Sequence, residues 1–205
     1  MQELGHPIKT ANPRVPVIFG VSAVRQHPET RPTHPTELMK RILPIPAEIF
    51  QYLRYEKETG KLYWKKSPAP RIAISDEANH VNQKGYIHIM FKGKKYLGHR
   101  LAWALGHETL DVPPILDHIN CIKTDNRLSN LREATCSQNS QNQPNKNPNG
   151  NLKGAFYQKE RGYWYSIIQS NLESTYLGSF ETELEAHAAY CKAAAELHGD
   201  FANFG

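Results

Sequence analysis

Cysteine is scarce in this chain, and its spacing excludes two common kinds of small domain. The three cysteines, Cys121, Cys136 and Cys191, contain no C-x-x-C pair and are odd in number. Neither a zinc knuckle nor a disulfide framework is therefore expected, and a reducing intracellular compartment, the cytoplasm, fits best. Cys121 and Cys136 are expected to fill small spaces rather than to bind a metal.

Long apolar runs are also missing. No stretch approaches the roughly 18 residues that a membrane helix needs. The N-terminus lacks a basic region followed by an apolar core, so it does not resemble a secretory signal. Hydrophobic residues make up 39% of the chain and the mean hydropathy is −0.62, which predicts small cores and some disorder. We expect no membrane partner.

Positive charge is concentrated in the middle of the chain. The net charge is +5 and the isoelectric point is near 9.0. Residues 41–143 contain 15 basic and 10 acidic side chains, whereas residues 144–205 contain 5 and 7. This distribution favours a polyanionic partner for the middle segment.

Composition divides the chain into three parts and a linker. Residues 1–40 are rich in proline and irregularly spaced histidine, which predicts a disordered N-terminal arm in which Met39 is a plausible alternative start. Residues 144–151 form a linker rich in Asn and Pro. The segments 41–143 and 152–205 are therefore expected to be two small domains.

Hydrophobic periodicity predicts the elements of the first domain. We expect helices over 47–54 and 99–105, the second ended by Gly106 and facing the core with Leu101, Ala102 and Leu105. Strands are expected over 61–65, 85–91, 95–97, 115–119 and 131–135. Thr135 and Gln138 form a capping box for a last helix through Asn142.

The stretch from Asp117 to Asn142 carries the chemistry. Hydrolysis of a phosphodiester needs an oriented base and a metal ion that stabilises negative charge. His118 is the natural base, because an imidazole with a pKa near 6.5 is largely neutral at cellular pH. The order strand, loop, strand, helix can bring Asp117 and His118 near Asn139. Carboxylate and amide oxygens suit Mg²⁺ or Mn²⁺ better than zinc.

This stretch resembles the HNH endonuclease family, above all its phage and intron-encoded homing branch. The Asp117-His118 pair, an asparagine 12 residues after the histidine, another 21 residues after it, N-R-L-x-N-L-R at 126–132 and H-R-L-x-W at 99–103 carry the resemblance. It implies an α+β fold with a small ββα-metal (His-Me finger) nuclease domain, acting inside a bacterial or phage-infected cell.

The resemblance also implies roles for individual residues. His118 is expected to be the general base, Asp117 and Asn139 to hold one divalent cation, and Asn130 to brace the loop; Asn142 remains an alternative to Asn139. Arg127 and Arg132 either contact DNA phosphates or pair with Asp125 and Glu133. His99 is expected to pack or cap its helix rather than to act in catalysis.

The C-terminal segment predicts a three-stranded antiparallel sheet packed on one helix. Strands are expected over 153–158, 163–169 and 174–177, with Trp164, Ser166 and Ile168 facing the helix. The helix begins at a capping box, Thr182 to Glu185, and ends at Gly199. Its core-facing line is expected to be Leu184, Ala188, Cys191 and Ala195.

This segment resembles the Apetala-two/ethylene-response-factor type of DNA-binding domain. K-G-A-F at 153–156, W-x-S-x-I at 164–168, Y-L-G-S-F at 176–180 and the alanine-rich helix at 188–199 carry the resemblance. It implies that the sheet binds the major groove of DNA through Lys153, Gln158, Lys159, Arg161, Tyr165, Gln169 and Tyr176. This sheet is less basic than is usual for that family.

Together these features predict a monomeric, metal-dependent endonuclease that nicks or cuts duplex DNA and uses no small-molecule cofactor. Two alternatives remain open at this point. The first is a non-catalytic, sequence-specific DNA-binding regulator. The second is an RNA-binding protein whose exposed tyrosines stack on unpaired bases.

Overall fold

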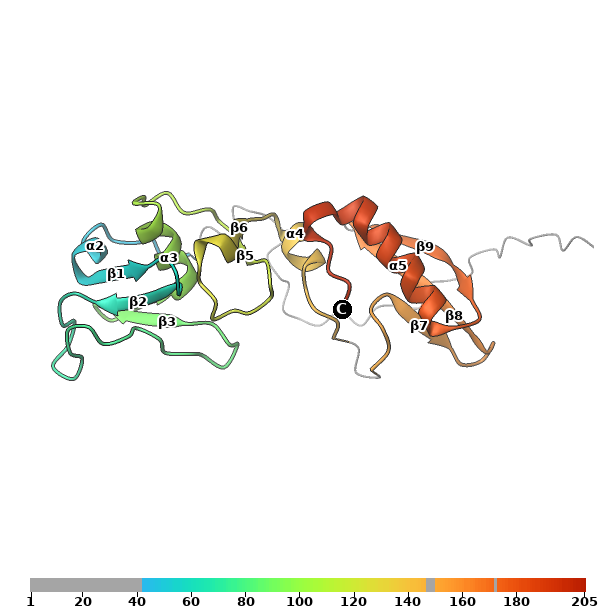
Figure 1. The fold of residues 1–205 in the computed structure, drawn as a ribbon, viewed down its shortest axis with the longest axis horizontal. Helices are drawn as coiled ribbons and strands as arrows, with labels where there is room; N and C mark the ends of the chain where they lie inside the picture. Colours follow the sequence, from blue (N-terminus) through green and yellow to red (C-terminus); the bar gives the residue numbers. More distant parts are fainter. Residues whose placement is uncertain (1–41, 147–149, 172) are drawn as a thin grey trace, which may run out of the picture. The chain divides into compact units, whose positions relative to one another are not determined.

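The computed structural model describes residues 42–146, 150–171 and 173–205 (Figure 1). The expected N-terminal arm with Met39 and the middle of the linker lie outside these residues. The described part is a mixed α/β structure of small sheets and short helices, which agrees with the expected class. No helix in the described ranges combines the length and the hydropathy needed to cross a membrane.

The described chain begins with two β-hairpins and a helix. Its elements in chain order are α2 (Ile49–Tyr52), β1 (Leu53–Glu56), β2 (Lys61–Trp64), β3 (His88–Phe91), β4 (Lys94–Leu97) and α3 (Gly98–Gly106). β1 pairs antiparallel with β2, and β3 pairs with β4. The strand expected over 85–91 is thus regular only from His88, with Ile87 in an isolated bridge to Val81.

The helix expected over 47–54 was wrong at Leu53 and Arg54, which belong to a strand. Only one turn, α2, is helical, and the chain then extends into β1. Leu53 pairs with Trp64 across the β1–β2 ladder, and both side chains are buried in the core. Burial against a distant strand therefore overrides the local helical pattern.

Helix α3 packs against the main core and against the chain that leads into the next strand, and it thereby positions the polar stretch that follows. Leu101 and Ala102 join the main core, as expected. Leu105 is only partly buried, whereas Ala104 is fully buried against Val112 and Leu116. This second contact holds the start of the next strand on the helix.

The polar stretch folds as strand, loop, strand and helix. These elements are β5 (Leu116–His118), the 3-10 turn η1 (Leu128–Asn130), β6 (Leu131–Glu133) and α4 (Cys136–Gln141). β5 and β6 are antiparallel, and both bonds of the expected Thr135–Gln138 capping box are present at the start of α4. Gly60, in the β1–β2 turn, has a φ of +74°, and a Cβ there would lie 2.3 Å from the Arg127 backbone nitrogen. The first hairpin therefore touches the loop of this stretch.

The C-terminal segment forms one antiparallel sheet with a long helix. β7 (Ala155–Gln158), β8 (Tyr163–Ser170) and β9 (Glu173–Phe180) are followed by α5 (Glu183–His198) and the 3-10 turn η2 (Gly199–Phe201). Ser166 and Ile168 are buried on the helix side, as the alternation predicted. The capping box at Thr182 is present.

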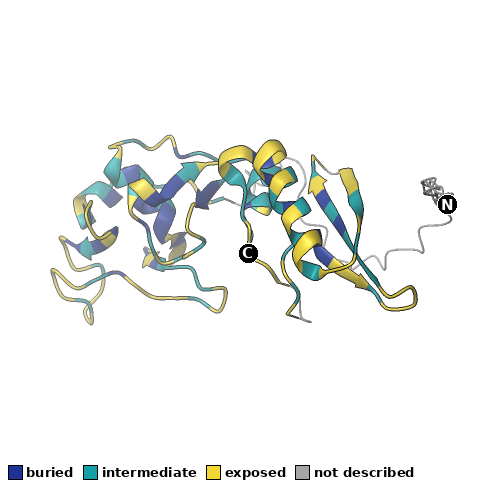
Figure 2. Cartoon of the chain, turned by 45° about the vertical axis from the view of Figure 1, so that its right-hand side comes forward, coloured by how far each residue is buried: buried dark blue, intermediate teal, exposed yellow. Residues whose placement is uncertain are grey.

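The expected buried face of α5 was wrong except at Cys191, which is partly buried against the core. Leu184 is 71% exposed, and the buried line is Ala186, Tyr190, Ala194 and His198; Figure 2 shows the buried and exposed sides of the helix. Tyr190 lies on the backbone of Gly154, where a Cβ would approach its ring to 2.1 Å. A close ring-to-glycine contact thus fixes the rotation of the helix.

Candidate functional site

The β5–β6 hairpin presents Asp117 and His118, which are both buried. The loop between the strands is held by Asn130. Its Oδ1 accepts a hydrogen bond from the Asn120 backbone nitrogen (3.0 Å), and its Nδ2 donates to the Asp125 carbonyl (2.8 Å). Asn130 therefore joins the two ends of the loop, which is the geometry of a bracing residue.

His118 is oriented by Asn126, a residue that sequence reasoning left without a role. Asn126 is 1% exposed, and its Oδ1 lies 3.1 Å from His118 Nε2. Because an amide oxygen only accepts hydrogen bonds, Nε2 carries the proton and Nδ1 keeps a free lone pair. The Tyr55 hydroxyl donates to the Asn126 carbonyl (3.0 Å) and holds this segment in turn.

Burial keeps the His118 imidazole neutral. Desolvation lowers the pKa of His118 below its usual value, although the Asn126 hydrogen bond and the Asp117 charge oppose the shift. Lys123 also lowers this pKa, so its ammonium lies within electrostatic reach of the ring. A neutral imidazole can accept a proton from water.

His99 packs against His118 and caps no helix. The two rings meet edge to face with centroids 5.2 Å apart. Burial, with a smaller effect from His118, lowers the pKa of His99 to about 3. His99 Nδ1 has no hydrogen-bond partner in the described part of the chain. His99 is therefore a neutral wall of the site.

The Asp117 carboxylate is held by two donors. Arg132 Nε lies 2.9 Å and Nη2 2.8 Å from Asp117 Oδ2. Asn142 Nδ2 lies 2.9 Å from the same oxygen and 3.1 Å from Oδ1. The same amide donates to the carbonyl of His118 at 2.9 Å. Asn142 thus fixes the Asp117–His118 pair, and Arg132 pairs with Asp117 rather than with Glu133.

The structure brings Asn142, and not Asn139, into contact with Asp117. Asn139 makes backbone bonds, from its nitrogen to Thr135 (3.0 Å) and from Gln143 Nε2 to its carbonyl (3.2 Å). No cluster of three or more His, Cys, Asp or Glu side chains that could hold a metal occurs within the described ranges. Within the part of the chain that the structure describes, Asp117 Oδ1 accepts one bond, from Asn142 at 3.1 Å, so this oxygen can still ligate a cation. A carboxylate oxygen is a ligand that Mg²⁺ prefers, and Mg²⁺ keeps several waters in its coordination shell.

The cationic side chains near Asp117 and His118 have different partners. Arg127 forms a two-point pair with Asp125, Nε to Oδ1 at 2.8 Å and Nη2 to Oδ2 at 2.6 Å, which agrees with the ion-pair alternative. Arg132 also reaches the Asp200 carbonyl (2.6 Å) and lies 3.7 Å from the centroid of the Phe201 ring. Lys123 instead lies 4.7 Å from the centroid of the Tyr86 ring, and that ring lies 6.1 Å from His118.

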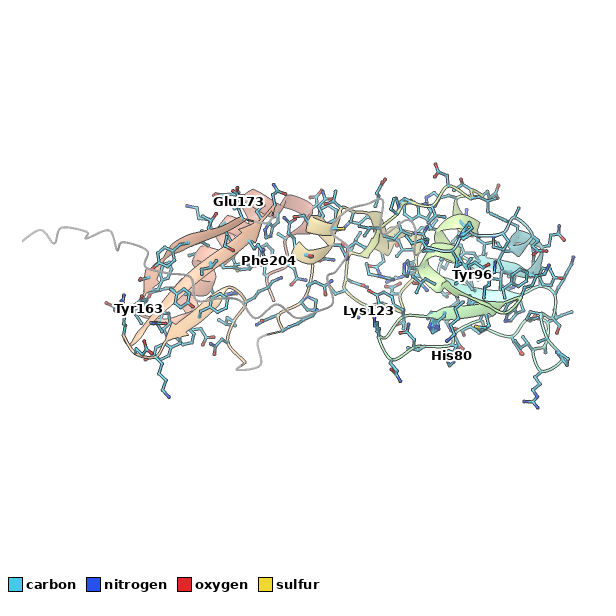
Figure 3. All side chains as sticks on the ribbon, turned by 180° about the vertical axis from the view of Figure 1, so that it is seen from behind. His80, Tyr96, Lys123, Tyr163, Glu173 and Phe204 are labelled. Atoms are coloured by element: carbon cyan, nitrogen blue, oxygen red, sulfur yellow. The ribbon has the colours of Figure 1, made fainter. Side chains whose placement is uncertain are left out.

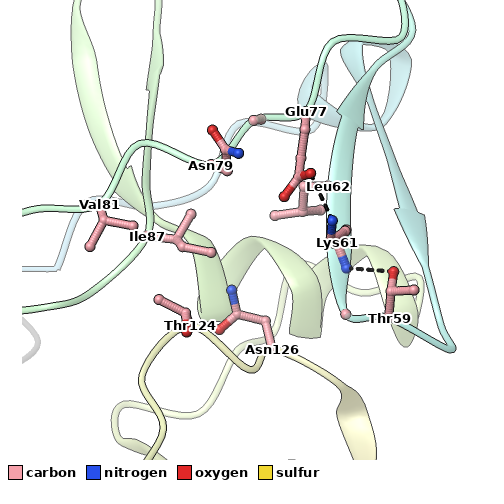
Figure 4. Close-up of a pocket in the computed structure, with 11 residues that line it drawn as sticks. Thr59, Lys61, Leu62, Glu77, Asn79, Val81, Ile87, Thr124 and Asn126 are labelled. Atoms are coloured by element: carbon pink, nitrogen blue, oxygen red, sulfur yellow. Dashed lines mark hydrogen bonds and ion pairs between the residues drawn. The ribbon is translucent and has the colours of Figure 1, made fainter.

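A cavity of about 300 Å³ lies behind the loop (Figure 4). Asn126 and Thr124 line one side, and the Lys61–Glu77 ion pair (2.9 Å) lines another. Asp117 and His118 do not line it. The cavity therefore adjoins the residue that orients His118 but not the candidate reactive groups.

The exposed face of the C-terminal sheet carries a row of aromatic rings. The near-parallel rings of Phe156 and Tyr165 lie 5.5 Å apart, and those of Tyr165 and Tyr176 lie 6.5 Å apart. Phe156 is 40% exposed and was not among the expected DNA-facing residues. Its place in register with Tyr165 could have indicated it.

The other residues expected to contact DNA differ in their exposure to solvent. Gln169 is exposed, Gln158 is partly buried at the end of β7, and Lys159 and Arg161 are exposed in the β7–β8 turn. Lys153 does not project freely. Its Nζ donates to the carbonyl of Gln143 (2.6 Å) and to Asn203 Oδ1 (3.2 Å), and burial lowers its pKa to about 8.

Comparisons with known proteins agree with the nuclease part of the site. Residues 96–141 match the model of a family described as HNH endonuclease, and this range includes Asp117, His118, Asn126, Asn130 and Asn139. The chain is 32% identical over 108 residues to Protein 3.8 of Escherichia phage T7, covering 52% of this chain and 88% of that protein.

A second relative is named as a nuclease. The chain is 33% identical over 126 residues to the uncharacterized HNH endonuclease L560 of Acanthamoeba polyphaga mimivirus. The match covers 60% of this chain, which spans 64% of the length of that relative. No solved structure matches the chain.

Proposed function

Because this chain belongs to the HNH endonuclease family, we propose that it is a metal-dependent DNA endonuclease of the homing type. It hydrolyses phosphodiester bonds in duplex DNA, and it nicks one strand or cuts both. The observation that carries this proposal is the 3.1 Å bond between Asn126 and His118 Nε2. This bond leaves Nδ1 as the base, and the charge of the buried Asp117 carboxylate acts on the ring.

The proposed reaction assigns each nearby side chain a step. His118 Nδ1 accepts a proton from water, the water oxygen attacks the phosphorus atom, and the bond to the 3′ oxygen breaks, which leaves a 5′-phosphate end. Asn126 keeps the imidazole in the productive tautomer, and Asn130 holds the loop. Arg132 and Asn142 orient Asp117.

A divalent cation, Mg²⁺ or Mn²⁺, would stabilise negative charge on the phosphate and on the departing oxygen. Asp117 would hold it together with an asparagine, for which Asn139 remains the proposal from spacing. The order of β5, β6 and α4 supports a ββα-metal arrangement for this centre.

We propose that the C-terminal domain is of the Apetala-two/ethylene-response-factor type and contributes target recognition. The exposed face with Tyr165, Gln169 and Tyr176 supports this role, as do Lys159 and Arg161 in the turn. Duplex DNA is the proposed partner, and the protein acts as a monomer in the cytoplasm.

The direct test is incubation of the purified protein with duplex DNA in Mg²⁺ and, separately, in EDTA. Cleavage in Mg²⁺ alone is the expected result. The rival reading is a non-catalytic regulator that binds DNA through the exposed aromatic face. Tight DNA binding without cleavage, together with calorimetry that detects no Mg²⁺ or Mn²⁺ binding in the presence of DNA, would favour that rival.

A further inference from the structure

A cationic side chain beside His118 would help to hold a DNA phosphate for the proposed reaction, but the two expected arginines are each paired with a carboxylate. Arg127 is compensated by Asp125 at 2.6 Å, and Arg132 by Asp117 at 2.8 Å. Removing Arg132 from its partner would leave the 4%-exposed Asp117 carboxylate without its counter-ion. The positive charge of each guanidinium is therefore already balanced by a carboxylate.

Lys123 is the cation near His118 that forms no ion pair in the described part of the chain. It lies on the loop between β5 and η1 (Figure 3). Its Nζ donates to the Lys84 carbonyl at 2.8 Å. An ammonium has three N–H donors, so this bond leaves two for a ligand.

Tyr86 links Lys123 to the reactive pair. Its ring lies below the Lys123 ammonium, 4.7 Å from Nζ to the centroid, and 6.1 Å from the His118 ring. Burial and the negative charge of Asp117 raise the pKa of Tyr86, so its hydroxyl remains a donor at neutral pH. The ring and the Lys84 carbonyl hold Lys123 in place, which lowers the entropy cost of binding a ligand.

We propose that Lys123 and Tyr86 form the phosphate-binding side of this centre, where the ammonium and the phenol donate to oxygens of the DNA phosphate next to His118. This inference rests on the proposed function. It assigns the substrate contact to a lysine and a tyrosine, and it gives Arg127 and Arg132 structural roles.

The test compares Lys123→Met with Lys95→Met, which removes the same charge from an exposed position on β4. DNA binding is measured in EDTA over a range of salt concentrations, and single-turnover cleavage is measured in Mg²⁺ with protein in excess. Lys123→Met is expected to reduce the slope of log K against log salt by about 0.9, the value for one phosphate contact. It is also expected to slow cleavage by roughly 10- to 100-fold, the cost of one charge-assisted contact.

Two further variants separate charge from packing. Lys123→Arg keeps the charge and is expected to keep the salt slope. Tyr86→Phe is expected to keep the slope, since the hydroxyl is neutral, and to slow cleavage by about tenfold, the cost of one hydrogen bond. Thermal unfolding of each variant checks that the fold is retained.

The outcomes distinguish this inference from the proposed function. If the wild type cleaves DNA and Lys123→Met matches Lys95→Met in both slope and rate, the phosphate site is wrong and the nuclease stands. If the wild type does not cleave but Lys123→Met alone loses slope, the phosphate site stands and the nuclease function fails.

Discussion

At the scale of single residues, His99 makes the stability of the protein depend on pH. Its pKa is about 3 in the folded state and near 6.5 in an unfolded chain. Between these two pH values the unfolded state therefore binds more protons than the folded state. The free energy of unfolding consequently decreases as the pH falls from about 6.5 towards 3. The expected loss by pH 5 is about 2 kcal/mol in the free energy of unfolding.

Urea unfolding at pH 7 and pH 5 measures this loss. The His99→Gln variant should show a smaller change between the two pH values than the wild type, because it lacks the buried imidazole. His107→Gln, at an exposed position, is the control and should behave like the wild type. An unchanged pH dependence in His99→Gln would contradict the neutral, buried assignment.

Asn142 gives a second prediction at this scale. Its amide donates to Asp117 and to the carbonyl of His118, and the residue is 3% exposed. Asn142→Asp places a carboxylate among acceptors, which should reduce the free energy of unfolding by about 3 kcal/mol or more. Asn139→Asp, on α4 one turn before Asn142, is the comparison, and equal losses in chemical denaturation would contradict the bracing role.

At the scale of elements, the β1–β2 hairpin supports the loop that orients the base. Gly60 and Gly93 have φ values of +74° and +73°, but only Gly60 lies against other atoms. Gly60→Ala and Gly93→Ala should share a backbone cost of about 1 kcal/mol. Gly60→Ala should destabilise the protein further and slow cleavage, because it pushes on the segment of Asn126.

Denaturant unfolding and single-turnover cleavage of the two alanine variants measure the difference. Equal stability and equal rates would show that the hairpin does not support the loop.

Local interactions within these elements could be predicted from the sequence, whereas contacts between distant segments could not. The capping boxes at Thr135 and Thr182 were predictable because their bonds are local. The strand at Leu53 was not, because its partner Trp64 is brought to it only by folding. In the site, the polar stretch was predictable from spacing. The contact of Asn126 with His118 was not, because it depends on the path of a loop with no periodic pattern.

At the scale of the whole molecule, we expect cutting and target binding to depend on different parts of the chain. The double variant Lys159→Gln/Arg161→Gln removes two exposed cations from the β7–β8 turn. It should weaken DNA binding and reduce the salt slope by up to about two, while the cleavage rate at saturating protein stays unchanged. Lys192→Gln on α5 is the control for charge alone, and a lower rate at saturation with unaltered affinity would contradict this division.

The central claim is that His118 activates water for cleavage of DNA. The most direct measurement is single-turnover cleavage of duplex DNA in Mg²⁺ by His118→Ala, with DNA binding measured in parallel and the exposed His107→Ala as control. We expect His118→Ala to lose cleavage and to keep DNA binding, and His107→Ala to keep both. Cleavage by His118→Ala at the wild-type rate would show that His118 is not the base.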